Sequence, residues 1–276
     1  MFAKGVLLVE GDAEAILIPN LVKNIFGITL DELGISLINI GSTGFENVAQ
    51  IFHDNRLQRK CSIITDLDAA IVDTTPSDED GEKLKKYKEK LLRSEQKGEA
   101  RKVILEDFIS GNQWVKTFYA DHTFEVDFIK SGNTNEAKSL CEQIYTNATK
   151  ISEAEREILS GDIGQYGKRI LTMANKQGKG WFSILLSEQI TFQTKIPKYI
   201  LDAILFLNPL STKHLKVNVI NYRIKKSIEE NNTLDFSDVE TKIQAYLQDE
   251  CHLSEIKDLL QSIIPNDQVL EILERV

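Results

Sequence analysis

Short apolar runs alternate with helical patterns in the first part of the chain. The first three runs are each followed by a glycine or an acidic residue, and such runs are typical of buried strands in a parallel sheet. The expected strands are residues 5–9, 35–40, 61–65 and 114–119. Residues 13–26 and 45–54 carry apolar side chains at helical spacing. This alternation predicts an α/β fold with a central, mainly parallel sheet flanked by helices.

The rest of the chain is expected to be mainly helical. Residues 77–102 are dense in Lys and Glu, which indicates a solvated helix or a mobile insertion into a core of residues 1–130. We expect a polar helical insertion over residues 131–160, with the last part of the core in residues 161–208. Residues 209–276 are predicted to form a C-terminal extension of short helices.

Composition points to an ordinary globular protein, with 42% hydrophobic and 27% charged residues. No apolar run approaches the ~20 residues of a membrane helix, and the first strand begins too early to leave room for a signal peptide. Cys61, Cys141 and Cys251 are scattered, which suits neither a disulfide framework nor a zinc site. A cytoplasmic location without membrane contact is therefore expected.

The net charge of −9 is unusual for a protein that binds nucleic acid. An enzyme that works through divalent cations must nevertheless gather carboxylates, and bound cations then reverse the local field. The net charge therefore does not exclude a nucleic-acid substrate.

A first acidic motif follows the first expected strand. Glu10 stands at the tip of that strand, and Gly11 allows a sharp turn into the helix. Glu14 lies on the first helical turn, where it can converge with Glu10. A simpler interpretation is that acidic residues here only favour a helix N-terminus.

A second acidic motif, Asp66-Leu67-Asp68, follows the strand at residues 61–65. Carboxylates crowded at a strand end repel one another unless they are protonated or bind a cation. Their hard oxygen atoms suit Mg²⁺ or Mn²⁺. An Asp-X-Asp sequence alone also occurs in ordinary turns, but both acidic motifs within one α/β pattern are more specific.

The ordered motifs Val-Glu-Gly-Asp-Ala-Glu at 9–14, Asn-Ile-Gly at 39–41 and Thr-Asp-Leu-Asp at 65–68 resemble the Toprim domain of topoisomerases, primases and nucleases. More narrowly, residues 2–15 are similar to the start of the Toprim region in the OLD (overcoming lysogenisation defect) family of ATP-dependent endonucleases. The segments 123–127 and 178–182 look like later motifs of that family.

The resemblance implies a site for two Mg²⁺ or Mn²⁺ ions. Glu10, Glu14 and Glu125 would surround chiefly one ion, and Asp66 and Asp68 the other. The remaining roles would fall to Thr65, which would supply an oxygen or support a ligand, to Lys179, which would contact the scissile phosphate, and to Gly41, which would keep the floor of the site open to the substrate backbone. The catalytic residues would be Lys179, Glu10 and Asp66.

Basic residues gather near this lysine. Residues 161–198 hold six basic residues and two acidic ones, which makes Lys168, Arg169 and Lys176 candidates for binding substrate phosphates. The alternative is that they are solubilising helix charges. Lys176 also competes with Lys179 for the catalytic role, because the spacing across the glycine turn is uncertain.

These observations predict a metal-dependent DNA endonuclease, the nuclease part of an OLD-type ATPase-nuclease in phage defence or DNA repair. The alternatives are another Toprim enzyme acting on nucleic acid and a catalytically silent interaction module. The phosphate-loop pattern Gly-x-x-x-x-Gly-Lys-Ser/Thr is missing, so ATP binding is not expected in this chain. We expect the ATPase on a missing N-terminal region or a separate chain, and a homodimer is possible.

Overall fold

Four parallel strands form the sheet of the computed structural model, which describes residues 3–207 and 209–275. Their order is β2-β1-β3-β4. The central strands β1 and β3 consist almost entirely of buried residues, as a parallel sheet covered on both faces requires. The strands are β1 (Gly5–Val9), β2 (Ile35–Asn39), β3 (Lys60–Asp66) and β4 (Val115–Ala120). The α/β fold with a parallel sheet is therefore confirmed.

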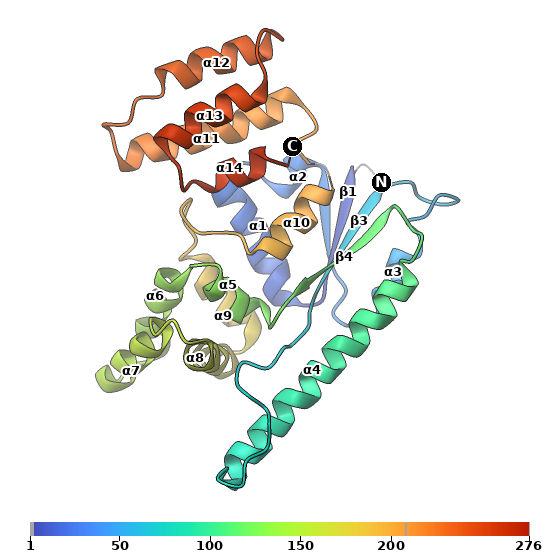
Figure 1. Cartoon of the computed structure of the whole chain (residues 1–276), viewed down its shortest axis with the longest axis vertical. Helices are drawn as coiled ribbons and strands as arrows, with labels where there is room; N and C mark the ends of the chain where they lie inside the picture. The colour runs from blue at the N-terminus through green and yellow to red at the C-terminus, as the bar shows by residue number, and fades with distance from the viewer. Residues whose placement is uncertain (1–2, 208, 276) are drawn as a thin grey trace.

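Each face of the sheet has its own hydrophobic cluster, because successive side chains of a strand point to opposite faces. Leu7 and Ile64 join the cluster that contains the buried residues of helices α1, α9 and α10. Leu8 and Ile63 face the other way and pack with residues around α3 and at the end of α4. Figure 1 shows these two layers on either side of the sheet. The helices are α1 (Asp12–Phe26), α3 (Glu46–Ala49), α4 (Glu82–Phe108), α9 (Lys179–Ser187) and α10 (Lys198–Phe206).

The remaining helices build on the first face. A short helix precedes β2, a group of four follows β4, and another group of four ends the chain (Figure 1). They are α2 (Leu30–Leu33), α5 (Phe124–Lys130), α6 (Thr134–Ile144), α7 (Ala148–Ile158), α8 (Ile163–Gln177), α11 (Lys213–Glu230), α12 (Ser237–Leu247), α13 (Leu253–Ile263) and α14 (Gln268–Leu273). In the described residues, no helix combines the length and apolar character needed to cross a membrane.

Several elements differ from the sequence predictions. The helix expected over residues 45–54 is shorter and consists only of α3. Most of the charged segment 77–102 forms the regular helix α4, which continues beyond that range to Phe108. The polar insertion consists of two helices, because Asn147 caps the start of α7 by accepting a hydrogen bond from the Lys150 N–H. Residues 1, 2, 208 and 276, which bound several of the predicted segments, lie outside the described residues.

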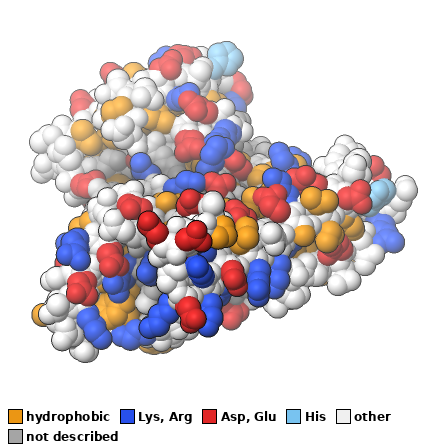
Figure 2. All heavy atoms as spheres, turned by 60° about the horizontal axis from the view of Figure 1, so that its bottom comes forward, with side chains coloured by type: hydrophobic (Ala, Val, Ile, Leu, Met, Phe, Trp, Pro, Cys, Tyr) orange, Lys and Arg blue, Asp and Glu red, His pale blue; other side chains and the backbone are white. Residues whose placement is uncertain are grey.

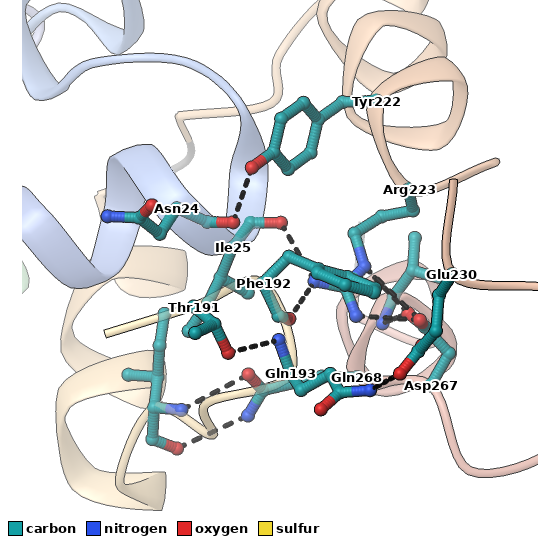
Figure 3. Close-up of polar contacts among 12 residues, drawn as sticks. Asn24, Ile25, Thr191, Phe192, Gln193, Tyr222, Arg223, Glu230, Asp267 and Gln268 are labelled. Atoms are coloured by element: carbon teal, nitrogen blue, oxygen red, sulfur yellow. Dashed lines mark hydrogen bonds and ion pairs between the residues drawn. The ribbon is translucent and has the colours of Figure 1, made fainter. Parts of the chain in front are cut away.

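The C-terminal helices are fixed to the core by a buried guanidinium group. Arg223 on α11 is 3% exposed and pairs with Asp267 at 2.6 Å. It also donates a hydrogen bond to the carbonyl of Phe192, and neighbouring Tyr222 donates to the carbonyl of Asn24 at the end of α1 (Figure 3). The buried side chains of α11 and α14 join the same hydrophobic cluster as those of α1. Residues 209–275 therefore share the core of the sheet rather than packing only among themselves.

Replacing Asp267 should reveal how much this anchor contributes. The variant Asp267→Ala leaves the buried Arg223 guanidinium without its counter-ion, so we expect the free energy of unfolding to fall by about 3–5 kcal/mol. Urea unfolding followed by circular dichroism measures the change. The control Glu229→Ala breaks only the exposed pairs with Lys225 and Lys226 and should have little effect. Equal stability of the two variants would show that the anchor is not important for folding.

Candidate functional site

The turn between β1 and α1 places the first two acidic residues. Glu10 follows the strand directly, and Gly11 is the extended residue that caps α1. Glu14 lies on the first turn of the helix and is 7% exposed. Asp12 accepts a hydrogen bond of 2.8 Å from the Asn39 side chain, which links the ends of β1 and β2. The carboxyl edge of the sheet thus holds both glutamates in fixed backbone positions.

The end of β3 lies next to this turn. Thr65 is buried, and its hydroxyl donates a hydrogen bond of 2.7 Å to Glu10 Oε2. Asp66 is the last residue of the strand. Asp68 has a φ of +55°, a left-handed conformation that aspartate tolerates better than most residues, and its N–H donates to the carbonyl of His122 at 3.1 Å. The loops after β3 and β4 therefore hold each other in place.

Helix α5 adds a third glutamate to this edge. Glu125 is 1% exposed, and neither of its carboxylate oxygens has a hydrogen-bond partner in the described chain. Asp127 instead accepts hydrogen bonds from the N–H groups of Asp121 and His122, at 2.7 and 3.4 Å. Asp127 therefore ties the loop that precedes α5 to this helix.

Lys179 is the cation that faces the acidic residues. It begins α9 directly after Gly178, whose φ of +83° lies in the region that favours glycine. Its Nζ atom is 3.7 Å from Glu125 Oε1. The pKa of Lys179 is raised, chiefly by Glu125 and further by Asp66, Glu14 and Asp68. The same helix packs against α1, so Lys179 and Glu14 are held on neighbouring helices.

The acidic residues lie near enough to influence one another's ionisation. Burial raises the pKa of Asp66 well above its ordinary value, and the charges of Glu14, Glu125 and Asp68 raise it further. The pKa of Glu14 is raised mainly by burial and then by Glu125 and Glu10. Burial also raises the pKa of Asp68, although the nearby Arg101 opposes this shift. The site therefore concentrates negative charge that would be relieved by a cation.

Several carboxylate oxygens at this edge are free to bind a divalent ion. One oxygen of Asp66 and both of Glu125 are buried without hydrogen-bond partners among the described residues, and buried acceptors of this kind are rare unless they have a ligand. Within residues 3–207 and 209–275, however, no three acidic, histidine or cysteine side chains already converge as a metal centre. The donor set thus fits Mg²⁺ or Mn²⁺, and the side chains would have to draw together around the ion.

Comparison with known proteins finds a family that the first part of the chain resembles. Residues 1–68 match the family model described as the TOPRIM domain of overcoming lysogenization defect protein-like proteins. This first part of the chain is therefore similar to an OLD-like Toprim domain. That match includes Glu10, Glu14, Asp66 and Asp68, but ends before Glu125. No curated protein matches the chain.

Solved structures show the same fold over most of the chain. The C-terminal region of the Burkholderia pseudomallei OLD protein is similar with a TM-score of 0.54 and 24% identity, covering 77% of this chain and 100% of that one. The C-terminal region of the Xanthomonas campestris pv. campestris OLD protein gives a TM-score of 0.50 and 18% identity, covering 81% and 99%. The likeness therefore extends well beyond the residues of the family model.

The other candidate residues lie in different surroundings. Gly41 is exposed with a φ of +67°, and a side chain there would meet open space. Lys176 donates to the carbonyl of Ile144 at 2.9 Å, so its ammonium is held at the end of α6. Arg169 pairs with Glu157 at 2.6 Å and thereby joins α8 to α7. Lys168 lies over the ring of Tyr87 on α4.

Helix α4 contributes two residues to the acidic site that the sequence did not single out. Arg101 donates to the carbonyl of Asp66 and lies 3.5 Å from Asp68 Oδ2. Gly98 makes this approach possible, since an added Cβ would lie 1.9 Å from the carbonyl oxygen of Leu67. Neither residue stands out within a run rich in charged residues and poor in apolar ones. The only sequence feature that could have indicated them is a glycine one helical turn before an arginine.

Tyr199 on α10 is a further residue near the acidic site that sequence patterns missed. Its hydroxyl is buried without a hydrogen-bond partner in the described part of the chain. Burial raises the pKa of Tyr199 well above its ordinary value, and the charges of Asp66 and Glu14 add to the shift. The hydroxyl therefore faces the same acidic region from a helix that is distant in sequence.

The close contact at Gly98 can be tested with a pair of glycine variants. Alanine is favoured over glycine inside a helix by about 1 kcal/mol, yet Gly98→Ala should destabilise the protein, because the new methyl group would clash with the backbone at Leu67. Gly180→Ala, in α9, meets open space and should be neutral or stabilising. Thermal unfolding compares the two. A melting temperature that rises equally in both variants would contradict the contact.

The raised pKa of Asp66 predicts an unusual pH dependence of stability in buffer with a metal chelator. A carboxyl group whose pKa is higher in the folded than in the unfolded state contributes stability at low pH, which is lost as the pH rises through the raised pKa. Because asparagine does not ionise, the variant Asp66→Asn does not lose this stability as the pH rises. Its stability relative to the native chain should therefore increase from about pH 4 to about pH 8, measured by urea unfolding.

A matched control has the opposite sign. Hydrogen bonds from Thr75 lower the pKa of the exposed Asp73, so this carboxylate contributes stability above its ordinary pKa. Asp73→Asn should therefore become less stable than the native chain as the pH rises to about 4, and the difference between them should change little from about pH 4 to about pH 8. A relative stability of Asp66→Asn that falls as the pH rises would contradict the acidic environment described for this site.

Proposed function

We propose that this chain is a Mg²⁺- or Mn²⁺-dependent DNA endonuclease, the nuclease part of an OLD-type ATPase-nuclease. The observation that carries this proposal is that Lys179 lies 3.7 Å from the buried Glu125 and within the electrostatic influence of acidic side chains from two other parts of the chain. Glu14, Asp66 and Glu125 come from α1, β3 and α5, and all three raise the pKa of Lys179. A cluster that served only to stabilise the fold would be costly, because burying several like charges together is unfavourable.

The carboxylates divide into two groups of ligands in this proposal. Glu10, Glu14 and Glu125 hold one divalent ion, and Asp66 and Asp68 hold the other, with Thr65 orienting Glu10 through its hydrogen bond. Two bound ions supply Lewis-acid activation of a water molecule and stabilisation of the leaving oxygen. The rigid sheet edge fixes two of these ligands directly, because Glu10 follows β1 and Asp66 ends β3.

Lys179 contacts the scissile phosphate and stabilises the negative charge that develops in the transition state. Its raised pKa keeps the ammonium protonated at neutral pH. Lys176 is a weaker candidate for this role, because its ammonium is bonded to the carbonyl of Ile144. Lys168 remains a candidate for binding substrate phosphates, whereas Arg169 is already paired with Glu157.

The DNA is expected to bind through a limited set of contacts. Acidic and basic side chains are intermixed over the face that Figure 2 shows, which does not favour broad electrostatic attraction. We further propose that ATP is bound by a separate ATPase region or chain, and that the protein acts in phage defence or DNA repair. Homodimer formation and a cytoplasmic location remain predictions.

A catalytically silent interaction module is the alternative, and one observation favours it. Lys179 lies near Glu125 and Arg101 near Asp68, so protein cations already face two of the proposed ligands. In that case the acidic cluster would hold helices together without cleaving DNA. Cleavage assays separate the two functions.

Plasmid cleavage should be measured with Mg²⁺, Mn²⁺ or Ca²⁺ as the only divalent ion. We expect the native chain to cut with Mg²⁺ or Mn²⁺, and Asp66→Asn and Lys179→Met each to lower the rate by roughly 100-fold or more. Lys176→Met is the matched control, because it removes the same charge three residues earlier, on α8, and it should retain most activity. Undiminished cleavage by both site variants would overturn the proposed site, and no cleavage by the native chain would favour the interaction module.

A further inference from the structure

A cavity of about 260 Å³ lies between α4 and α8, directly beside the acidic site. Asp68 and His122 line its inner end. Tyr87, Lys90 and Leu91 line it from α4, where their spacing places them on one face of the helix. Figure 1 shows that α4 runs from the sheet past α8, so the cavity lies between a core helix and a projecting one.

A second cavity continues this space away from the acidic site. It has a volume of about 740 Å³ and shares Tyr87, Lys168 and Thr172 with the first. The two cavities therefore form one groove between α4 and α8, which begins at Asp68. We call this the α4–α8 groove.

The lining of the α4–α8 groove combines positive charge with flat and apolar surface. Its acidic members are Asp68 at the inner end, Asp73, and Glu157, which is paired with Arg169. Lys90 and Lys168 form no direct ion pair within the described part of the chain, whereas Lys88 is paired with Asp80. Lys168 lies 5.8 Å from the centre of the Tyr87 ring. Lysines suit phosphate groups, and an aromatic ring beside apolar side chains suits the face of a nucleic-acid base.

His122 adds a hydrogen-bonding group at the inner end. Its Nδ1 lies 2.8 Å from the carbonyl oxygen of Ala69. Since a carbonyl oxygen can only accept, Nδ1 carries the hydrogen, and Nε2 of the neutral ring is left as an acceptor. A base amino group at this end could therefore donate a hydrogen bond to Nε2 of His122, close to Asp68 in the same cavity.

We propose that the α4–α8 groove binds an unpaired DNA strand that flanks the scissile bond. Phosphates of this strand contact Lys90 and Lys168, and a base packs against Tyr87. A cavity of this size accepts single nucleotides but not a double helix, so the groove selects single-stranded or frayed DNA. This inference rests on the proposed function, because it takes Asp68 as a ligand of the ion at the cleavage site.

Binding rather than cleavage tests the groove. Fluorescence anisotropy measures the affinity of the full chain, in a metal chelator and low salt, for a labelled single-stranded oligonucleotide and its blunt duplex. The double variant Lys90→Ala/Lys168→Ala should bind the single strand about tenfold more weakly or worse, and Tyr87→Leu about tenfold more weakly. Duplex affinity should change much less.

The matched control is Lys85→Ala/Lys86→Ala, which removes the same charge from α4 at positions that line neither cavity. It should bind the single strand like the native chain. Equal losses in the two double variants would show general attraction and overturn the groove, as would unchanged binding in the Lys90/Lys168 variant or no binding by the native chain. If binding depends on the groove but plasmid is not cleaved, the groove survives and the nuclease proposal fails.

Discussion

Repulsion among carboxylates at the carboxyl edge of the sheet is the constraint on which the rest of this structure depends. Glu10, Glu14, Asp66, Asp68 and Glu125 are brought together by short, rigid connections to strands and helices. The free energy to hold them there comes from the two hydrophobic layers beneath. Lys179 and Arg101 moderate the repulsion from opposite sides, each from a helix far along the chain. The hydrophobic core thus stabilises the position of the acidic residues, and the acidic residues do not stabilise the core.

The sheet and its acidic edge were predictable because their signals are local. A buried strand is a short apolar run, and a residue directly after it must lie at the sheet edge, so Glu10 and Asp66 could be placed from the sequence. Glu125 and Lys179 were placed by resemblance to a family, since neither follows a strand directly. Their meeting at 3.7 Å required both α5 and α9 to pack against α8.

Other parts of the site could not be predicted because they depend on contacts between distant segments. Nothing in the charged run of α4 indicates which side faces the sheet, so Gly98 and Arg101 were missed. The same limit applies to Tyr199, whose neighbours pack against it only in the folded chain. Lys176 and Arg169 show the converse: basic residues that suggest phosphate binding in the sequence are engaged with Ile144 and Glu157 in the structure.

The contact at Gly98 also gives α4 a mechanical property. A helix rises about 1.5 Å per residue, so about 24 Å of α4 lies on the outer side of Gly98 and Arg101 lies only about 4–5 Å beyond it on the inner side. The inner end of the helix is also fixed, because Leu105 and Phe108 pack in the second hydrophobic cluster. A sideways bend of the long outer arm therefore reaches Arg101 only as a much smaller displacement. Motion far out on α4 is thereby reduced to the scale on which an ion pair with Asp68 is made or broken.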